Sequence, residues 1–366
     1  MAYKISDRAV LIESNGQSVL ITDTLTFGVS GTDSSGDFSN LAGGSVSNSF
    51  TLSDNYVFNY FKSPHQGITE GFSVAGAGGT PQKKNRCKFS FSSDGNASSI
   101  TDLTNQRLRI ATASSSTHAY ILGGNPGHVN TILRFPFASP GDGETQVGSL
   151  SVGRSRGSGH ASLTHAYTAG GAPGPLDPID KFPFSATEGT ASDVGDLTEG
   201  KTGGGSTSSQ TNAYLAGGNI PSSTPSTTEI ERFPFASDTN ATILSGVITV
   251  GRGKMSGATQ SETHGYTHGG NASPAPNLPI YNTIDKFPFS NDVNATDVGD
   301  LTQAVWDASG CSSNVSGYSM GGTTSAPSHN PGIKNTIEKW SFSTDGNATD
   351  VGDLTVSKGQ SGGFQV

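Results

Sequence analysis

Residues 252–270 read RGKMSGATQSETHGYTHGG, and after a loop residues 282–302 read NTIDKFPFSNDVNATDVGDLT. Nearly all of the chain after about residue 67 consists of copies of this stretch. Each copy has an aromatic followed by small residues and glycine, then a basic residue with two aromatics, then an ending related to DLT. The basic and aromatic landmark occurs six times, at residues 88–91, 134–137, 181–184, 232–235, 286–289 and 339–342. Self-similarity at about 46 to 54 residues is typical of repeat architectures.

Within one copy the apolar residues fall in short alternating runs, such as residues 284–289, separated by clusters of Gly, Ser, Asn and Pro. Alternation of this kind predicts strands rather than helices. The stretch predicts four of them, at residues 256–263, 265–269, 283–289 and 296–301. Four strands per repeat indicate a blade of a β-propeller, so the chain is expected to be all-β and six-bladed.

Glycine recurs in register with the predicted strands. The hydrophobic fraction is only 32%, and the 50 glycines bring the total near the usual apolar share. A Gly-Gly pair permits positive φ and close backbone approach. We therefore expect glycine to be a packing residue here, and not a component of flexible linkers.

These residues carry a family resemblance. The order R-G-x-x-S-G, a tyrosine followed by Gly-Gly, and N-T-I-D-K-F resembles the kelch repeat, which implies a propeller. The tryptophan expected on the fourth strand of a kelch blade is absent and D-V-G-D-L-T stands there, so no kelch-type partner is implied. The sequence motifs K-F-P-F-S, N-A-T-D-V-G-D-L-T and T-H-G-Y-T-H-G-G are similar to those of repeat proteins of marine bacteriophages, including cyanophage and pelagiphage types. That similarity covers about residues 67–366 and implies a virion structural or tail-fibre protein.

The two ends of the repeat array complement each other. The first unit begins abruptly with its second strand at Gly71, whereas residues 356–366 match the first strand of a unit and then stop. We expect this C-terminal strand to complete blade one, because closing the ring removes both free sheet edges. The predicted propeller domain is residues 67–366.

The preceding residues 1–66 are expected to be a β-arm and linker. Two apolar runs, residues 8–13 and 17–22, flank Ser-Asn-Gly, and Asn-Gly between such runs predicts a hairpin. So short an arm needs a partner to cover its apolar residues, which is its own ring, a second copy of the chain or another protein. We prefer a role as an assembly anchor, with other virion proteins as partners, and expect a homo-oligomer within the assembly. The anchoring residues would be Val10, Leu11, Ile12, Val19, Leu20 and Ile21.

Net charge and cysteine content limit the classes of partner that the chain is expected to have. The formal net charge is −9 and the pI about 5.3, which disfavours nucleic acid as a ligand of the whole chain. Basic pairs do recur near the start of the first strand of a unit and are expected to be structural or rim residues. They are Arg107 with Arg109, Arg154 with Arg156, and Arg252 with Lys254. The start of the sequence lacks an apolar signal core, no segment has the length of a membrane span, and two cysteines are too few for a disulfide scaffold. We expect synthesis in a host cytoplasm and no membrane insertion.

Repetition also tests for catalysis, because one active site needs its acid or nucleophile at one place. The carboxylate pairs recur in register and are interpreted as turn and strand-end residues. They are Asp193 with Asp196, Asp297 with Asp300, and Asp350 with Asp353. Three histidines share one repeat position, where a structural hydrogen bond is preferred over a metal, namely His118, His165 and His264. Four N-A-S or N-A-T triplets fit a glycosylation acceptor, a calcium loop or a plain turn, and the turn is preferred. No catalytic residue, metal or cofactor is predicted.

The loop between the second and third strands varies most among the copies. It lengthens from residues 125–131 in the second unit to residues 323–336 in the sixth. Length variation on a rigid scaffold is where binding residues usually lie, although neutral drift of surface loops explains the same variation. The contact candidates are Pro274, Pro276, Pro279, Tyr281, Asn282, His329 and Asn330.

Three functions follow from the sequence. We prefer a non-enzymatic virion structural protein of a bacteriophage, in the tail, a fibre or a surface decoration, whose arm anchors it and whose propeller attaches to the host surface. The alternatives are a carbohydrate- or receptor-binding propeller outside a particle, with host polysaccharide or a receptor as ligand, and a propeller glycosidase or oxidase. Fold alone is weak support for chemistry, so the enzyme comes last.

Overall fold

The computed structural model describes residues 10–14, 17–21, 66–78, 84–220, 226–254, 258–272, 279–325 and 332–366. The chain divides into two compact units, Met1–Phe61 and Lys62–Val366. In the first unit, β1 (Val10–Ser14) and β2 (Gln17–Ile21) pair antiparallel, from Val10 opposite Ile21 to Ser14 opposite Gln17. This confirms the predicted hairpin, and all six proposed anchoring residues belong to its strands.

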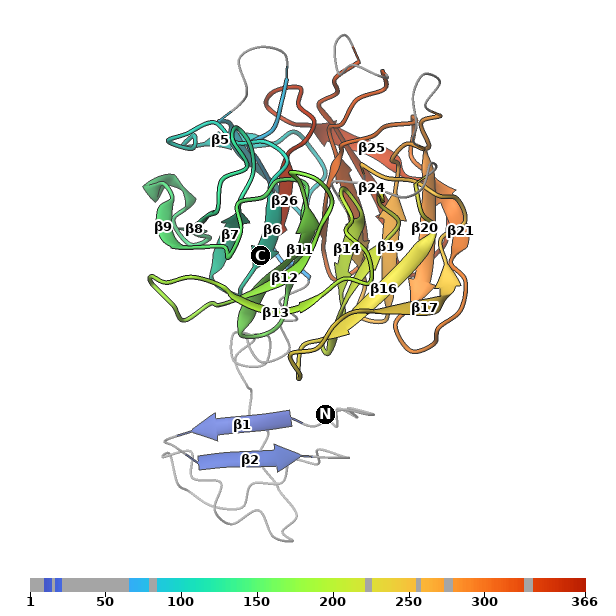
Figure 1. The fold of residues 1–366 in the computed structure, drawn as a ribbon. Coiled ribbons are helices and arrows are strands. Elements are labelled where there is room, and N and C mark those ends of the chain that lie inside the picture. The colour runs from blue at the N-terminus through green and yellow to red at the C-terminus, as the bar shows by residue number, and fades with distance from the viewer. Residues whose placement is uncertain are drawn as a thin grey trace, which may run out of the picture. The chain divides into compact units, whose positions relative to one another are not determined.

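The second unit is a ring of six four-stranded antiparallel sheets, which confirms the predicted six-bladed β-propeller (Figure 1). Blade one contains β26 (Gly362–Gln365), β3 (Glu70–Val74), β4 (Arg86–Ser90) and β5 (Ser98–Ile100). Blade two contains β6 (Ala111–Ser114), β7 (His118–Leu122), β8 (Thr131–Pro136) and β9 (Thr145–Ser149). Blade three contains β10 (Ser158–Ala161), β11 (His165–Gly171), β12 (Leu176–Pro183) and β13 (Ser192–Asp196).

The other three blades repeat this plan with the same strand order. Blade four contains β14 (Gly205–Ser208), β15 (Asn212–Ala216), β16 (Glu229–Pro234) and β17 (Thr242–Val247). Blade five contains β18 (Ala258–Gln260), β19 (His264–His268), β20 (Thr283–Pro288) and β21 (Thr296–Asp300). Blade six contains β22 (Ser309–Ser312), β23 (Ser316–Met320), β24 (Thr336–Ser341) and β25 (Thr349–Asp353). The one helix of the described residues is η1 (Pro140–Asp142), and none there is long and apolar enough to cross a membrane.

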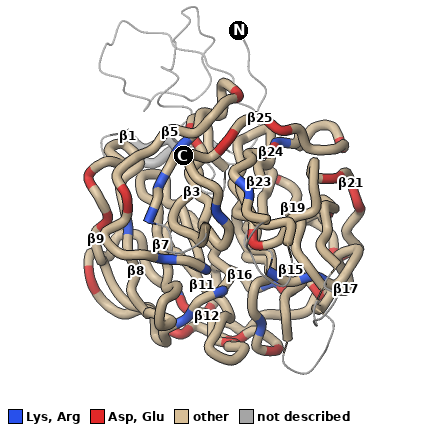
Figure 2. Tube along the Cα trace, turned by 90° about the horizontal axis from the view of Figure 1, so that it is seen from above, with Lys and Arg blue, Asp and Glu red and all other residues tan. Residues whose placement is uncertain are grey.

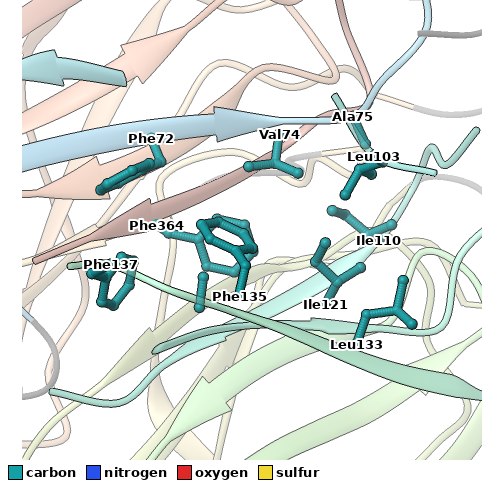
Figure 3. Packing of buried hydrophobic residues seen from close by; sticks show 11 residues of the cluster. Phe72, Val74, Ala75, Leu103, Ile110, Ile121, Leu133, Phe135, Phe137 and Phe364 are labelled. Atoms are coloured by element: carbon teal, nitrogen blue, oxygen red, sulfur yellow. The ribbon is translucent and has the colours of Figure 1, made fainter. Parts of the chain in front are cut away.

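The C-terminal strand closes the ring, as expected. β26 pairs antiparallel with β3, and Phe364 lies opposite Phe72. Both side chains are fully buried in the cluster between blades one and two, where they meet Phe135 and Phe137 (Figure 3). The last residues of the chain therefore supply the innermost strand of the first blade and part of its core.

One aromatic contact is repeated at every junction between blades. The second-strand aromatic of each blade packs on the second aromatic of the landmark in the next blade, with ring centroids 4.7 to 5.2 Å apart. The pairs are Phe72 with Phe137, Tyr120 with Phe184, Tyr167 with Phe235, Tyr214 with Phe289, Tyr266 with Phe342, and Tyr318 with Phe91. Such pairs contribute about 0.5–1.5 kcal/mol each beyond the area they bury. Because the pair from blade six to blade one matches the others, the closing junction is built like the rest.

A buried carboxylate forms a second inter-blade contact. Asp285 in β20 accepts hydrogen bonds from the backbone N–H and the hydroxyl of Thr249 in the preceding blade, at 3.1 and 2.7 Å. Arg252 Nη2 lies 2.9 Å from the same carboxylate, and both side chains are fully buried. Equivalent carboxylate contacts are Asp180 with Ser151, Glu231 with Thr198, and Glu338 with Thr302. The acidic residue of the third strand and the hydroxyl residue after DL are thus structural partners.

The Gly-Gly pairs allow neighbouring blades to approach closely. Gly170 and Gly171 have φ of 67° and 115°, a region that favours glycine, and four other blades show the same pair of angles within about 25°. A Cβ on Gly170 would lie 2.6 Å from the carbonyl oxygen of Lys201 in the next blade. The Gly171 N–H donates to that same carbonyl at 2.8 Å. This confirms the prediction that glycine is a packing residue.

Repeated polar residues at the outer strands also bind the backbone. Asp193 Oδ1 accepts the N–H of Gly195 at 3.3 Å. Asp297 and Asp350 accept the N–H of the glycine two residues later in the same way. The triplet asparagines reach the preceding blade, where Asn347 Oδ1 accepts the N–H of Asp300 at 3.0 Å. Asn96, Asn240 and Asn294 make the same contact. The interpretation of these residues as turn and strand-end residues is confirmed.

Candidate functional site

The six blades differ most at one end of their strands. Strand direction alternates within a blade, so the loop between the second and third strands and the connection to the next blade lie at the same end, here called the loop face. The loops on this face are residues 75–85, 123–130, 172–175, 217–228, 269–282 and 321–335. They contain from four to fifteen residues, whereas every hairpin between the third and fourth strands contains seven or eight. The loop face is therefore where binding specificity has room to vary.

Only part of the set of contact candidates lies within the described residues. Pro274, Pro276, His329 and Asn330 are outside them. Pro279 is exposed, and Tyr281 and Asn282 are half-buried. The carbonyls of Tyr281 and Asn282 accept the N–H groups of Val305 and Leu301, at 3.1 and 2.8 Å, so this part of the loop is held against its own blade.

A ring of six equivalent residues surrounds the axis at the loop face. Each one lies just before the first strand of its blade and has a left-handed backbone, with φ between 52° and 65°. The residues are Arg109, Arg156, Gly203, Lys254, Asp307 and Gln360. We call this set the axial ring. A left-handed conformation costs a non-glycine residue about 1–2 kcal/mol, so the contacts of the ring must offset it.

Backbone hydrogen bonds join the members of the axial ring. The N–H of one residue donates to the carbonyl of its neighbour in the preceding blade. The distances are 2.8 Å for Arg109 to Gln360, 2.8 Å for Arg156 to Arg109, 3.0 Å for Gly203 to Arg156, 2.8 Å for Asp307 to Lys254 and 2.7 Å for Gln360 to Asp307. These bonds fix the main chain around the axis at the loop face, here called the mouth of the ring. They hold the Cα atoms of the ring residues in place, so that the side chains start from fixed positions.

The side chains of the axial ring converge over the axis. Arg156 belongs to blade three and Asp307 to blade six, on opposite sides of the ring, yet Arg156 Nη1 lies 3.7 Å from Asp307 Oδ1. Gln360 donates from Nε2 to Asp307 Oδ2 at 2.9 Å, and both residues are buried. Lys254 Nζ lies 4.6 Å from the centre of the Trp306 ring. The side chains of Arg109, Arg156, Lys254, Asp307 and Gln360 form what we call the axial cluster.

The cations of this cluster perturb one another. Burial lowers the pKa of Arg109, and the nearby Arg156 lowers it further, while Asp307 opposes the change. Burial also lowers the pKa of Lys254, again with Arg156 adding to the effect and Asp307 opposing it. Burial and like charge both disfavour the charged form of a basic group. The mouth of the ring is thus a half-buried site where positive charge is concentrated.

Beneath the axial cluster the ring encloses little space. A cavity of about 20 Å³ lies under Arg109, Arg156 and Gly203, and another of about 50 Å³ lies between the innermost strands. Such volumes hold a few water molecules and no larger ligand. The innermost strands pack with their backbones almost touching, because a Cβ on Gly310 would lie 2.8 Å from the carbonyl oxygen of Ala258. Among the described residues, the innermost strands therefore leave little space along the axis.

The repeated histidines and the two cysteines are hydrogen-bonded or buried. The ring nitrogen Nδ1 of each of three equivalent histidines bonds the hydroxyl of the preceding threonine, at 2.8 to 2.9 Å, namely His118, His165 and His264. Cys87 and Cys311 are buried free thiols. Burial raises the pKa of the Cys311 thiol. Within the described parts of the chain, no group of three or more His, Cys, Asp or Glu is placed to hold a metal ion.

The axial cluster was not predicted from the sequence as a site. The recurrence of the basic pairs was the one indication in the sequence, but in the structure the two members of a pair lie in different environments. Arg154 and Arg252 are buried beside Asp180 and Asp285, whereas Arg156 and Lys254, two residues later, reach the axis. A scan against models of known protein families and a search of curated proteins both found no match to this chain.

Proposed function

We propose that this chain is a non-enzymatic structural and attachment protein, in which the N-terminal hairpin anchors the chain in a larger assembly and the propeller presents its loop face to a surface. The assembly would be a bacteriophage particle, and the surface that of the host cell. The resemblance of the repeat sequence supports the assignment to a particle, and the geometry of the ring supports the attachment role.

One observation carries the attachment role. The polar groups that recur in four of the six copies are engaged in contacts between blades, such as Asp285 with Thr249 and Asn347 with Asp300. The six loops of the loop face share a backbone bridge near their start, as between Asn219 and Thr202, but they differ in length from four to fifteen residues. Blades that repeat one geometry and differ in loop length at one end favour a scaffold that displays loops for binding.

The construction of the ring suits a protein of a particle. All six junctions use the same aromatic pair, and the closing junction adds the pairing of β26 with β3. Closure of the ring gives blade one its innermost strand, so that only the short outer strand of each blade remains as a sheet edge. The separate hairpin unit offers two short strands as an attachment element for another protein.

Quantitative mass spectrometry of purified particles from the source tests the proposal. We expect the chain to be present, at a small multiple of three or six copies for a tail or fibre and at hundreds for a capsid decoration. The purified chain should also bind host cells saturably, and shortening the loop of residues 269–282 to the four-residue loop of blade three should weaken that binding. Absence from particles would overturn the structural role, and cleavage of host polysaccharide by the pure chain would overturn the non-enzymatic one.

A further inference from the structure

The loops at the two ends of the blades differ in their content of acidic residues. None of the six loops on the loop face contains Asp or Glu, whereas every hairpin between a third and a fourth strand contains at least one. The loops instead contribute Lys83, Lys84 and Lys334. Figure 2 shows acidic segments mostly around the periphery and basic segments nearer the centre of the ring. The six loops between second and third strands therefore carry no carboxylate, and the acidic residues of this end lie in the connections between blades, at Asp102, Glu199 and Asp307.

The axial cluster lies at the centre of that end. It contains three cationic side chains, Arg109, Arg156 and Lys254, and one carboxylate, Asp307, which faces Arg156 at 3.7 Å. Three cations face one carboxylate, so the cluster has a surplus of two positive charges, and none of the six loops between second and third strands carries a carboxylate. The Nε of Arg109 is buried and has no hydrogen-bond partner among the described residues.

We propose that the axial cluster binds an oxyanion of the phosphate or sulfate type, either free or as the end group of a larger ligand. A guanidinium presents a planar fork of N–H donors that matches the oxygens of such anions, and charge-assisted hydrogen bonds are about twice as strong as neutral ones. Two surplus positive charges match a dianion. Half-buried charges are also screened less by salt than exposed ones.

The packing decides where the anion sits. The cavity beneath the cluster, about 20 Å³, is too small for a tetrahedral oxyanion. The anion therefore lies over the axial ring, in contact with Arg109, Arg156 and Lys254 and open to the loops. This inference does not depend on the proposed attachment role, because a free oxyanion would occupy the same place.

Trp306 provides a direct readout of the site, because Lys254 Nζ lies over its indole ring. An anion that draws Lys254 toward the axis should change the fluorescence of Trp306. The only other tryptophan, Trp340, occupies the position of a phenylalanine in the other five copies. Trp340→Phe therefore isolates the signal with a residue that the repeat already uses.

The test titrates the Trp340→Phe chain with inorganic phosphate or sulfate, with sodium chloride holding the ionic strength constant, and calorimetry on the unsubstituted chain confirms the affinity. We expect a saturable change that chloride does not give. Arg109→Gln should weaken binding on the order of ten- to hundredfold, the range of one charged hydrogen bond. Asp307→Asn should instead tighten binding, on the order of tenfold, because it removes the competing carboxylate.

Opposite effects of these two substitutions exclude simple damage to the fold. Arg232→Gln is the matched control, since Arg232 lies in an outer ion pair with Asp292, and it should bind phosphate like the parent chain. A sugar phosphate or sugar sulfate that binds more tightly than the free ion would identify an end group of a larger ligand, and weaker binding would identify the free ion. Equal responses to phosphate, sulfate and chloride, or unchanged affinity in Arg109→Gln, would overturn the proposal.

Discussion

Acidification is expected to destabilise the propeller through two buried histidines, His160 and His268, each only 2% exposed. Burial lowers the pKa of His160 to about 4 and that of His268 to about 3, from an ordinary value of 6.5. His160 Nδ1 lies 3.1 Å from the carbonyl oxygen of Thr207. His268 packs edge to face on Trp340, and neither of its ring nitrogens has a hydrogen-bond partner among the described residues. Both side chains are therefore neutral in the folded protein.

The sign follows from the depressed pKa values. The unfolded chain takes up the two protons near pH 6.5, whereas the folded chain resists until about pH 4 and pH 3. The stability is complete above pH 6.5 and is lost as the pH falls toward the folded pKa values. Between pH 7 and pH 5 each histidine should cost about 2 kcal/mol of unfolding free energy, and the two together about 4 kcal/mol.

Urea denaturation of the parent chain and of His268→Phe, at pH 7 and at pH 5, measures the effect. Phenylalanine keeps the edge-to-face packing on Trp340 and cannot be protonated, so this variant should lose about 2 kcal/mol less than the parent on acidification. Other titrating groups cancel in that difference. His264→Gln is the control, because His264 is half-buried and should change the pH dependence less. An identical pH dependence of the parent chain and His268→Phe would refute the reasoning.

Three further changes test the ring itself. Deleting residues 356–366 removes β26 and the buried Phe364, so the truncated chain should give no cooperative thermal transition, and a stable truncated monomer would count against closure. Gly170→Ala should cost about 2 kcal/mol or more by urea denaturation, because φ is 67° and the new Cβ would meet a carbonyl oxygen at 2.6 Å; a loss below about 0.5 kcal/mol would contradict this. Arg252→Gln should cost about 3–5 kcal/mol because it strands the buried Asp285, and restoration by Asp285→Asn would show that the unpaired charge is the cause.

Much of the fold could be predicted because its signals are local and repeated. The alternation in residues 284–289 predicts a strand in isolation, and six copies of one pattern fix the number of blades. The tail could be assigned to blade one because it matches a first strand that the first copy lacks. The Asp and Asn residues of the outer strands could be identified as structural because they recur in register.

The candidate site could not be predicted in the same way. Arg107 and Arg109 look alike in the sequence, as do Arg154 and Arg156, and spacing alone does not say which member points to the axis. The assignment depends on a left-handed backbone at the second member, which residue type does not require of arginine. Arg156 and Asp307 are about 150 residues apart and carry no mutual pattern.

The sequence by itself determined the number of repeats, the strands within each and the closure of the ring, because these depend on neighbours along the chain and on repetition. Only the tertiary structure decided which charges are buried as pairs and which gather at the mouth. The physical reason is that the sixfold arrangement brings one residue from each blade to a common axis. There the side chains of distant repeats interact, as Arg156 does with Asp307. The local pattern that builds a blade contains no information about which charges meet at the axis.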